Sequence, residues 1–257
     1  MSWKILLAMM VTFALMMSSS YTMLIPFLPI YMQSELGATA DNVSLWSGVT
    51  YAITFAISAF VSPIWGKLSD KMGKKPMIIR ASFLLAITYF LGGIVRTPFE
   101  LLLVRAFLGI ASGLWPACLV MMSACVPKNK IGISMGLMQS ANICGGIIGP
   151  LLGGILATAF GMRNSFYVGA VALSLITVTT ILFIKEPPVA PEKEINKAQN
   201  TSYLSFIKDK NILILLLCVC MTNLVILQIQ PIVSLYVQQL SHNSDKAVLL
   251  TGFIMSL

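Results

Sequence analysis

The chain has 257 residues, of which 57% are hydrophobic and only 10% are charged, and its mean hydropathy is +0.87. Soluble globular domains carry about 25% charged residues. This composition therefore excludes an ordinary soluble domain and indicates an integral membrane protein. The net charge of +8 would suit a nucleic-acid binder, but the distribution of the charges indicates a membrane surface instead.

Apolar runs recur along the chain at the length that a transmembrane helix requires. About 20 residues, each rising about 1.5 Å, cross about 30 Å of hydrocarbon. Backbone amides in lipid need internal partners, so these runs should be helices. The sequence predicts an eighth span that starts near 247 and seven earlier spans at about 4–30, 45–65, 76–94, 101–122, 131–160, 165–184 and 212–236.

The connections are short except at 185–211, which is rich in proline and charge and reads as a solvated linker. The predicted organisation is therefore all-α: a six-helix transmembrane bundle at 1–184, a cytoplasmic linker at 185–211, and the start of a second bundle at 212–257. Six helices, a long linker and further helices are typical of a transporter built from two halves.

The basic residues set the orientation. With a cytoplasmic amino terminus, 13 of the 17 Lys and Arg residues, Arg80 among them, lie in inner segments. Three lie outside and Arg105 falls within a span. This asymmetry is the positive-inside pattern. It predicts a multi-pass protein of the cell (inner) membrane whose basic residues face lipid headgroups and not nucleic acid.

The stretch "GKLSDKMGKK" joins the second and third spans on the inner side. Gly66 and Gly73 are expected to permit backbone geometry in which a side chain would clash. Asp70 is the one acid among lysines that include Lys74. At a helix start it would gain from the macrodipole, and it could also pair with a cation on another helix and latch two bundles. The alternative is a loop that only sets topology.

The fifth span contains "GLMQSANICGGIIGPLLGG". A stripe of small side chains lets another backbone approach closely. Pro150 lacks an amide donor and crowds the carbonyl of Gly146, so a bend is expected there. The alternative is ordinary small-residue packing. The stripe recurs at every fourth residue, as Ala141, Gly145, Gly149, Gly153 and Ala157.

Arg105 lies within the fourth span, where a cation costs about 2.5–3.5 kcal/mol at the membrane centre. It shares a face with Gly109, Gly113 and Ala117 by four-residue spacing, so it is expected to point into the bundle. The alternative is that it snorkels to the outer surface. Glu100 lies on another face and is not its expected partner.

Polar side chains on the spans are candidates for a substrate cavity. Interhelical hydrogen bonds worth about 0.6 kcal/mol each are the alternative role for any one of them. The candidates are Thr22, Trp46, Thr50, Tyr51, Trp115, Asn142, Asn223 and Gln230, with Ser18, Thr54 and Ser234 on the same helix faces.

No acid falls at mid-membrane in the first seven spans, because Glu35, Asp41, Glu100 and Asp245 lie near outer ends or in outer loops. A proton-carrying carboxylate therefore lies outside this sequence, or Glu35 or Glu100 lies deeper than expected. There is no C-x-x-C pair and one histidine, so the sequence predicts no metal site, no cofactor and no enzymatic activity.

These motifs resemble signatures of the major facilitator superfamily. "GKLSDKMGKK" is similar to the loop signature G-x-L-x-D-x-x-G-r-k, and "LLLVRAFLG" to the fourth-span signature with an embedded arginine. "IPFLP" resembles the first-span signature of the drug:proton antiporter branch. Lysines replace the usual arginines at Lys71 and Lys74, and Leu108 replaces a common glutamine. The antiporter signature G-x8-G-x3-G-P-x2-G-G is matched by Gly136, Gly145, Gly149, Pro150, Gly153 and Gly154.

The resemblance covers about the first two-thirds of a twelve-helix member and is closest to bacterial multidrug efflux proteins. It implies a major facilitator fold with the complete N-terminal six-helix bundle, the seventh helix and the start of the eighth. It implies a monomeric secondary transporter that exports small amphipathic drug-like compounds by alternating access in exchange for protons. The alternatives are a truncated fragment or associating subunit without autonomous transport, and a metabolite uptake carrier of the same fold.

The resemblance also implies roles for single residues. Asp70, with Gly66, Gly73 and Lys74 in the same loop, would stabilise the outward-open arrangement by bridging to the second half. Arg105 would take part in proton coupling. The glycines of the fifth span, with Pro150, would seal the outer half of the cavity against leakage.

Overall fold

The computed structural model describes residues 2–39, 41–186, 210, 212–222, 236–237 and 251–254, with Asp70 described by its backbone alone. Within these ranges the chain is helical and has no strand. The elements are α1 (Trp3–Leu24), α2 (Leu28–Glu35), α3 (Val43–Met72), α4 (Lys74–Ile94), α5 (Pro98–Ala111), α6 (Leu114–Cys125), η1 (Lys128–Lys130), α7 (Ile131–Phe160) and α8 (Met162–Phe183).

Six helical stretches in the described residues are long and apolar enough to cross a membrane, and each coincides with a predicted span. They expose large apolar side chains on their outer faces, such as Phe60, which is 82% exposed. The chain is therefore a multi-pass membrane protein. The stretches are Trp3–Leu24, Val43–Ser69, Lys74–Ile94, Pro98–Cys125, Lys128–Phe160 and Met162–Phe183.

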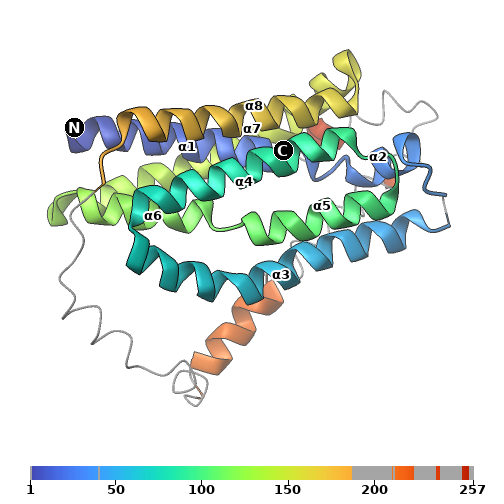
Figure 1. Cartoon of the computed structure of the whole chain (residues 1–257). Helices are drawn as coiled ribbons and strands as arrows, with labels where there is room; N and C mark the ends of the chain where they lie inside the picture. Colours follow the sequence, from blue (N-terminus) through green and yellow to red (C-terminus); the bar gives the residue numbers. More distant parts are fainter. Residues whose placement is uncertain are drawn as a thin grey trace.

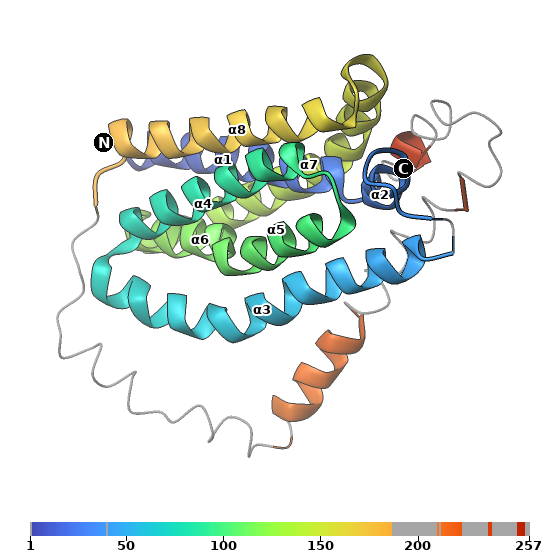
Figure 2. The same cartoon turned by 45° about the vertical axis from the view of Figure 1, so that its right-hand side comes forward.

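The six spans pack as one bundle. Figures 1 and 2 show α8 and α1 on one side and α3 on the opposite side, with α4 and α5 between them. The most extensive pairings are α1 with α7, α4 with α8 and α3 with α5. A further apolar helix, Ile212–Thr222, extends away from the bundle on the α3 side (Figures 1 and 2). Most of the predicted linker, together with Asn223, Gln230 and Ser234, lies outside the described residues.

The first span is not one helix, as the sequence predicts, but two. The first helix, α1, ends at Leu24, and α2 begins at Leu28. Pro29 has no amide to donate to the carbonyl four residues earlier, that of Ile25, and its ring crowds that oxygen. The hydroxyl of Tyr51 on α3 donates to the Ile25 carbonyl instead. The amide of Leu28 also donates to this carbonyl, at 3.3 Å, so a turn hydrogen bond and a side chain from another helix together replace the helical hydrogen bond that the proline removes.

The fourth span is also broken, where the sequence predicts a continuous helix. The break separates α5 from α6, and Gly113 adopts φ +108°, a left-handed conformation that favours glycine. Pro116 stands in the same relation to the carbonyl of Ser112 as Pro29 does to that of Ile25. Arg80 on α4 donates from Nη2 to the Ser112 carbonyl at 3.0 Å. Gly113 therefore does not continue the helical face of Arg105 and Gly109.

The glycines of α7 bring its backbone against that of α1. A Cβ at Gly145 would lie 2.6 Å from the carbonyl oxygen of Leu15, and one at Gly149 would lie 2.7 Å from that of Ser19. This is the close backbone approach that the four-residue spacing predicts. Gly136 has open space around it in the described structure. The helix α7 continues through Pro150 without a break.

Candidate substrate cavity

A cavity of about 490 Å³ lies inside the bundle, between α1, α3, α4, α7, α8 and the broken fourth span. Its wall is mainly apolar and aromatic, with hydroxyl groups and one carboxamide. Ligand cavities in proteins commonly have this mixture and a volume of about 300–1,000 Å³. The lining residues are Met17, Ser18, Tyr21, Thr22, Thr54, Phe55, Ser58, Leu85, Tyr89, Leu108, Ser112, Gly113, Trp115, Pro116, Asn142, Ile143, Gly146 and Leu173.

Three of the predicted cavity residues, Thr22, Trp115 and Asn142, line this cavity. Trp46, Thr50 and Tyr51 are not among its lining residues. Thr50 is fully buried between helices, and Trp46 packs against the apolar core. The Tyr51 hydroxyl is held by the Ile25 carbonyl at the break of the first span. Asn223 and Gln230 lie outside the described residues.

Several hydroxyl groups of the wall also join helices. Ser18 donates to the carbonyl of Asn142 at 2.6 Å, which links α1 to α7. Thr54 donates to the carbonyl of Arg105 at 3.1 Å, and the hydroxyls of Ser58 and Ser112 lie 2.9 Å apart. Both roles considered from the sequence, cavity lining and interhelical bonding, therefore apply to the same side chains.

Sequence reasoning missed Ser58, Ser112, Tyr21 and Tyr89, all of which line the cavity. For Ser58 the signal was available, because it continues the face of Thr50 and Thr54 by four more residues. Ser112 gave no comparable signal, since its position depends on the break between α5 and α6.

Arg105 is buried, with 6% of its surface exposed. Its side chain therefore points into the bundle and does not snorkel outward. Within the described part of the chain no carboxylate lies within ion-pair distance of it.

The outer acids are at the surface. Glu35 forms an ion pair with Arg163 at 2.7 Å, and both side chains are about one-third exposed, at 32% and 34%. Glu100 accepts from the amide of Arg96 at 2.7 Å, while Thr97 accepts from the amide of Glu100 at 3.2 Å, a capping arrangement at the start of α5. Neither acid is buried inside the bundle.

The inner loop differs from its sequence interpretation in two respects. Asp70 lies in the last turn of α3 and not at a helix start. Glu186, which follows α8, takes that position instead: its carboxylate accepts from the amides of Lys74 at 2.6 Å and Lys75 at 2.9 Å. Gly73 has φ +95° beside Glu186, as a glycine requirement predicts, whereas Gly66 has open space around it in the described structure.

The α7 motif also touches the start of the predicted eighth span. Residues 251–254 are helical, and Thr251 and Gly252 are buried. A Cβ at Gly252 would lie 2.6 Å from the carbonyl oxygen of Pro150 and 3.4 Å from the ring of Phe27. The proline of α7 therefore lies at a contact between the six-helix bundle and the following part of the chain.

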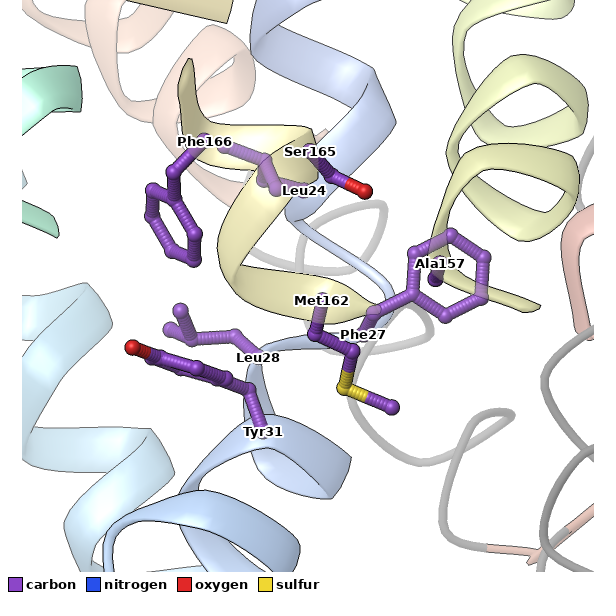
Figure 3. Close-up of a pocket in the computed structure, with 8 residues that line it drawn as sticks. All are labelled: Leu24, Phe27, Leu28, Tyr31, Ala157, Met162, Ser165 and Phe166. Carbon is purple, nitrogen blue, oxygen red and sulfur yellow. The ribbon is translucent and has the colours of Figure 1, made fainter. Parts of the chain in front are cut away.

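A second pocket, shown in Figure 3, lies between the break of the first span and the facing ends of α7 and α8. Its volume is about 10 Å³, which is about the space that one water molecule needs. The rings of Tyr31 and Phe166 stand 5.1 Å apart at its edge (Figure 3). It is too small for a substrate. Its lining residues are Leu24, Phe27, Leu28, Tyr31, Ala157, Met162, Ser165 and Phe166.

A family model described as "Major Facilitator Superfamily" matches residues 8–257. The chain belongs to the Major Facilitator Superfamily. The resemblance found in the motifs is thereby confirmed, and the helical bundle agrees with the N-terminal bundle of that fold.

Curated relatives of this superfamily member carry names of multidrug efflux proteins. The chain is 33% identical over 246 residues to "Multidrug resistance protein MdtG" of Rahnella sp. (strain Y9602), with 93% of this chain and 58% of that protein covered. It is 32% identical over 263 residues to the protein of the same name from Proteus mirabilis (strain HI4320), with coverages of 100% and 64%. It is 35% identical over 243 residues to "Multi-drug resistance efflux pump PmrA homolog" of Lactococcus lactis subsp. lactis (strain IL1403), with coverages of 93% and 58%. The chain thus spans about three-fifths of the length of these relatives.

Solved structures agree on the fold. The crystal structure of the nucleoside transporter NupG (D323A mutant) matches with a TM-score of 0.72 at 17% identity, covering 98% of this chain and 64% of that one. The in meso crystal structure of the POT family transporter PepTSo matches with a TM-score of 0.63 at 15% identity, with coverages of 100% and 52%. At these identities the likeness shows the fold alone.

Proposed function

We propose that this chain forms the N-terminal part of a secondary transporter that exports small amphipathic compounds across the cell (inner) membrane in exchange for protons. The observation that carries the proposal is the 490 Å³ cavity with its apolar, aromatic and hydroxyl-bearing wall. The names of the relatives support multidrug efflux as the activity. The proposed domains are the bundle at 1–184, the linker at 185–211 and the start of a second bundle at 212–257, with the amino terminus in the cytoplasm.

In this proposal a second bundle packs against the open side of the cavity. Rocking of the two bundles then exposes the cavity to each side of the membrane in turn, which is alternating access. In this proposal the inner loop with Gly66, Asp70, Gly73 and Lys74 stabilises the outward-open state. Arg105 contributes to proton coupling from inside the bundle. Its burial without a carboxylate partner in the described residues supports that role.

The antiporter motif of α7 seals the outer half of the cavity in this proposal. Two contacts support it: the glycines lie against α1, and Pro150 lies against Gly252. The proton-carrying carboxylate belongs to a part of the transporter beyond the described bundle, because the acids nearest to the outer ends of these spans are exposed.

The test is efflux of two dyes of opposite charge, ethidium and carboxyfluorescein, from cells that express the chain. Active export of either dye that stops when a protonophore is added supports the proposal. Retention of both dyes by cells that express a reading frame extended to the relatives' full length would overturn it. Movement of protons in the same direction as the dye in vesicles would indicate an uptake carrier instead.

A second candidate function is that of an associating subunit without autonomous transport. The chain covers 58% to 64% of the length of the relatives named as multidrug resistance proteins. Dye export that requires co-expression of a separate segment carrying the remaining helices would support it. Export by the 257-residue chain alone would exclude it.

A further inference from the structure

Arg80 lies directly behind the wall of the cavity. The sequence groups it with the inner-surface charges, but it sits in α4, six residues after Lys74, or about 9 Å along the helix. Its guanidinium stacks on the ring of Trp65, with Cζ 3.5 Å from the ring centroid. Its Nη2 donates to the carbonyl of Ser112, which lines the cavity.

This hydrogen bond uses only part of the donor capacity of Arg80. A guanidinium has five N–H donors and keeps its charge in proteins. The Nε and Nη1 atoms of Arg80 are buried and have no acceptor among the described residues. Arg80 as a whole is partly buried, but a buried donor without an acceptor is costly. Arg80 therefore has donor capacity left beyond the hydrogen bond to the carbonyl that Pro116 leaves free.

The bundle holds a second cation without an ion pair in the described structure, and no acid lines the cavity. Arg105 is buried in the bundle, although neither it nor Arg80 is itself a lining residue. No Asp or Glu is among the lining residues, and the one ion pair in the described structure, Glu35 with Arg163, is at the surface. Two guanidinium groups in a low-dielectric bundle without a counter-charge make the potential of this wall positive.

We propose that this wall binds the anionic group of the substrate, and that Arg80, beside Ser112 and Gly113 at the break of the fourth span, is the residue that holds it. The inference rests on the proposed transport function and narrows it: the compounds are amphipathic molecules that carry a carboxylate or a similar anion. The first turn of α6 begins at the same point, so the positive end of its dipole adds to the attraction.

The experiment compares three probes with the same ring system: 2-naphthoate, its neutral methyl ester and the cation 2-naphthylmethylammonium. The 257-residue chain is placed in phosphatidylcholine nanodiscs, which hold no net-anionic lipid that could occupy the site. Binding is measured by equilibrium dialysis against empty nanodiscs. Because charge-assisted hydrogen bonds contribute about 1.5–3 kcal/mol, the naphthoate should bind at least about tenfold more tightly than the ester.

Arg80→Gln should abolish the preference for naphthoate and leave ester binding unchanged, and the retained ester binding shows that the bundle is folded. Arg163→Gln is the matched control, because it removes one positive charge from an exposed position at the other end of the bundle. It should keep the preference. Equal preference in Arg80→Gln and in the parent chain would overturn the proposal.

A second pair of variants tests the effect of charge at the cavity wall while the hydrogen bond from Arg80 to the Ser112 carbonyl stays in place. Ser58→Asp places a carboxylate on the cavity wall next to Ser112, and Ser58→Asn is its uncharged counterpart of the same shape. The Asp variant should lose the preference and the Asn variant should keep it. Equal preference in these two variants would also overturn the proposal. Saturable binding of the ester without selectivity for naphthoate leaves the proposed transport function standing, whereas no saturable binding of any probe contradicts the cavity itself.

Discussion

The contact between α1 and α7 and the break between α5 and α6 use the same two residue types with opposite results. In α7, Gly145, Gly149 and Gly153 remain helical and admit a neighbouring backbone, and the helix continues through Pro150. In the fourth span, Gly113 takes a positive φ three residues before Pro116, and the helix stops. In the fourth span the interruption coincides with a glycine that leaves the helical conformation, whereas the glycines around Pro150 stay helical and α7 continues.

The two regions also differ in how their backbone groups are satisfied. Packing against α1 depends on the absence of side chains, whereas the end of α5 is capped by two side chains. The indole of Trp65 donates to the carbonyl of Ile110 at 2.9 Å, and Arg80 donates to that of Ser112. One region is a close backbone-to-backbone contact, and the other is a break in a helix whose end is capped by side chains beside the cavity. Four predictions test this distinction.

The largest effect is expected at the close contact. Gly149→Ala would place a Cβ 2.7 Å from the carbonyl oxygen of Ser19, a backbone atom that cannot move alone. Overpacking of this kind should destabilise the bundle by about 3 kcal/mol. Unfolding by sodium dodecyl sulfate in mixed micelles measures it. Gly136→Ala, at an open position of the same helix, is the control and should be neutral or stabilising. Equal stability of the two variants would contradict the close packing.

At the break, Gly113→Ala should cost about 1–2 kcal/mol, because a left-handed conformation is unfavourable for a residue with a Cβ. The backbone φ of +108° is the cause. The same unfolding titration applies, with Gly132→Ala, which has open space and no positive φ, as the matched control. If the Gly113 variant unfolds at the same detergent concentration as the control, the break is not a strained joint.

Trp65→Phe tests the hydrogen bond that the Trp65 indole donates to the Ile110 carbonyl at the end of α5. The phenyl ring can still lie under Arg80, but the donor to the Ile110 carbonyl is lost. Loss of one such hydrogen bond should cost about 1 kcal/mol. Amide hydrogen exchange should also increase in the last turn of α5 and remain unchanged in α7. Faster exchange in both helices would show that the effect at the break is not local.

The smallest effect concerns the hydroxyl pair at the break. Ser58→Ala, Ser112→Ala and the double variant form a cycle across the 2.9 Å contact between their oxygens. The expected coupling is about 0.6 kcal/mol, the typical value for a hydrogen bond between transmembrane helices. A coupling free energy of zero would show that the two hydroxyls do not interact in the membrane.

The arrangement of spans was predictable because apolar length decides it, and all six spans of 1–184 coincide with helical stretches. The breaks were missed because length and hydropathy do not register them. A proline cannot donate a hydrogen bond to the carbonyl four residues earlier. This rule was applied to Pro150, and it also applies to Pro29 and Pro116. It identifies the free carbonyls of Ile25 and Ser112 but not their donors, because Tyr51 and Arg80 reach them from other helices.

The residues of the cavity were also only partly predictable, because they depend on how the helices pack. The stripe through Thr50 and Thr54 identified a polar face of α3, but the sequence could not show which of its residues reach open space. Asp70 was misplaced because "SDKMGKK" was interpreted as a loop, whereas α3 continues to Met72. The acid that caps α4 lies more than a hundred residues further along the chain, at Glu186.

That capping acid has a mechanical consequence. Glu186 is the second residue of the predicted linker, and its carboxylate accepts hydrogen bonds from the first two amides of α4. The segment that follows α8 is therefore tied to the turn at Gly73. Tension on that segment would act first on the turn between α3 and α4.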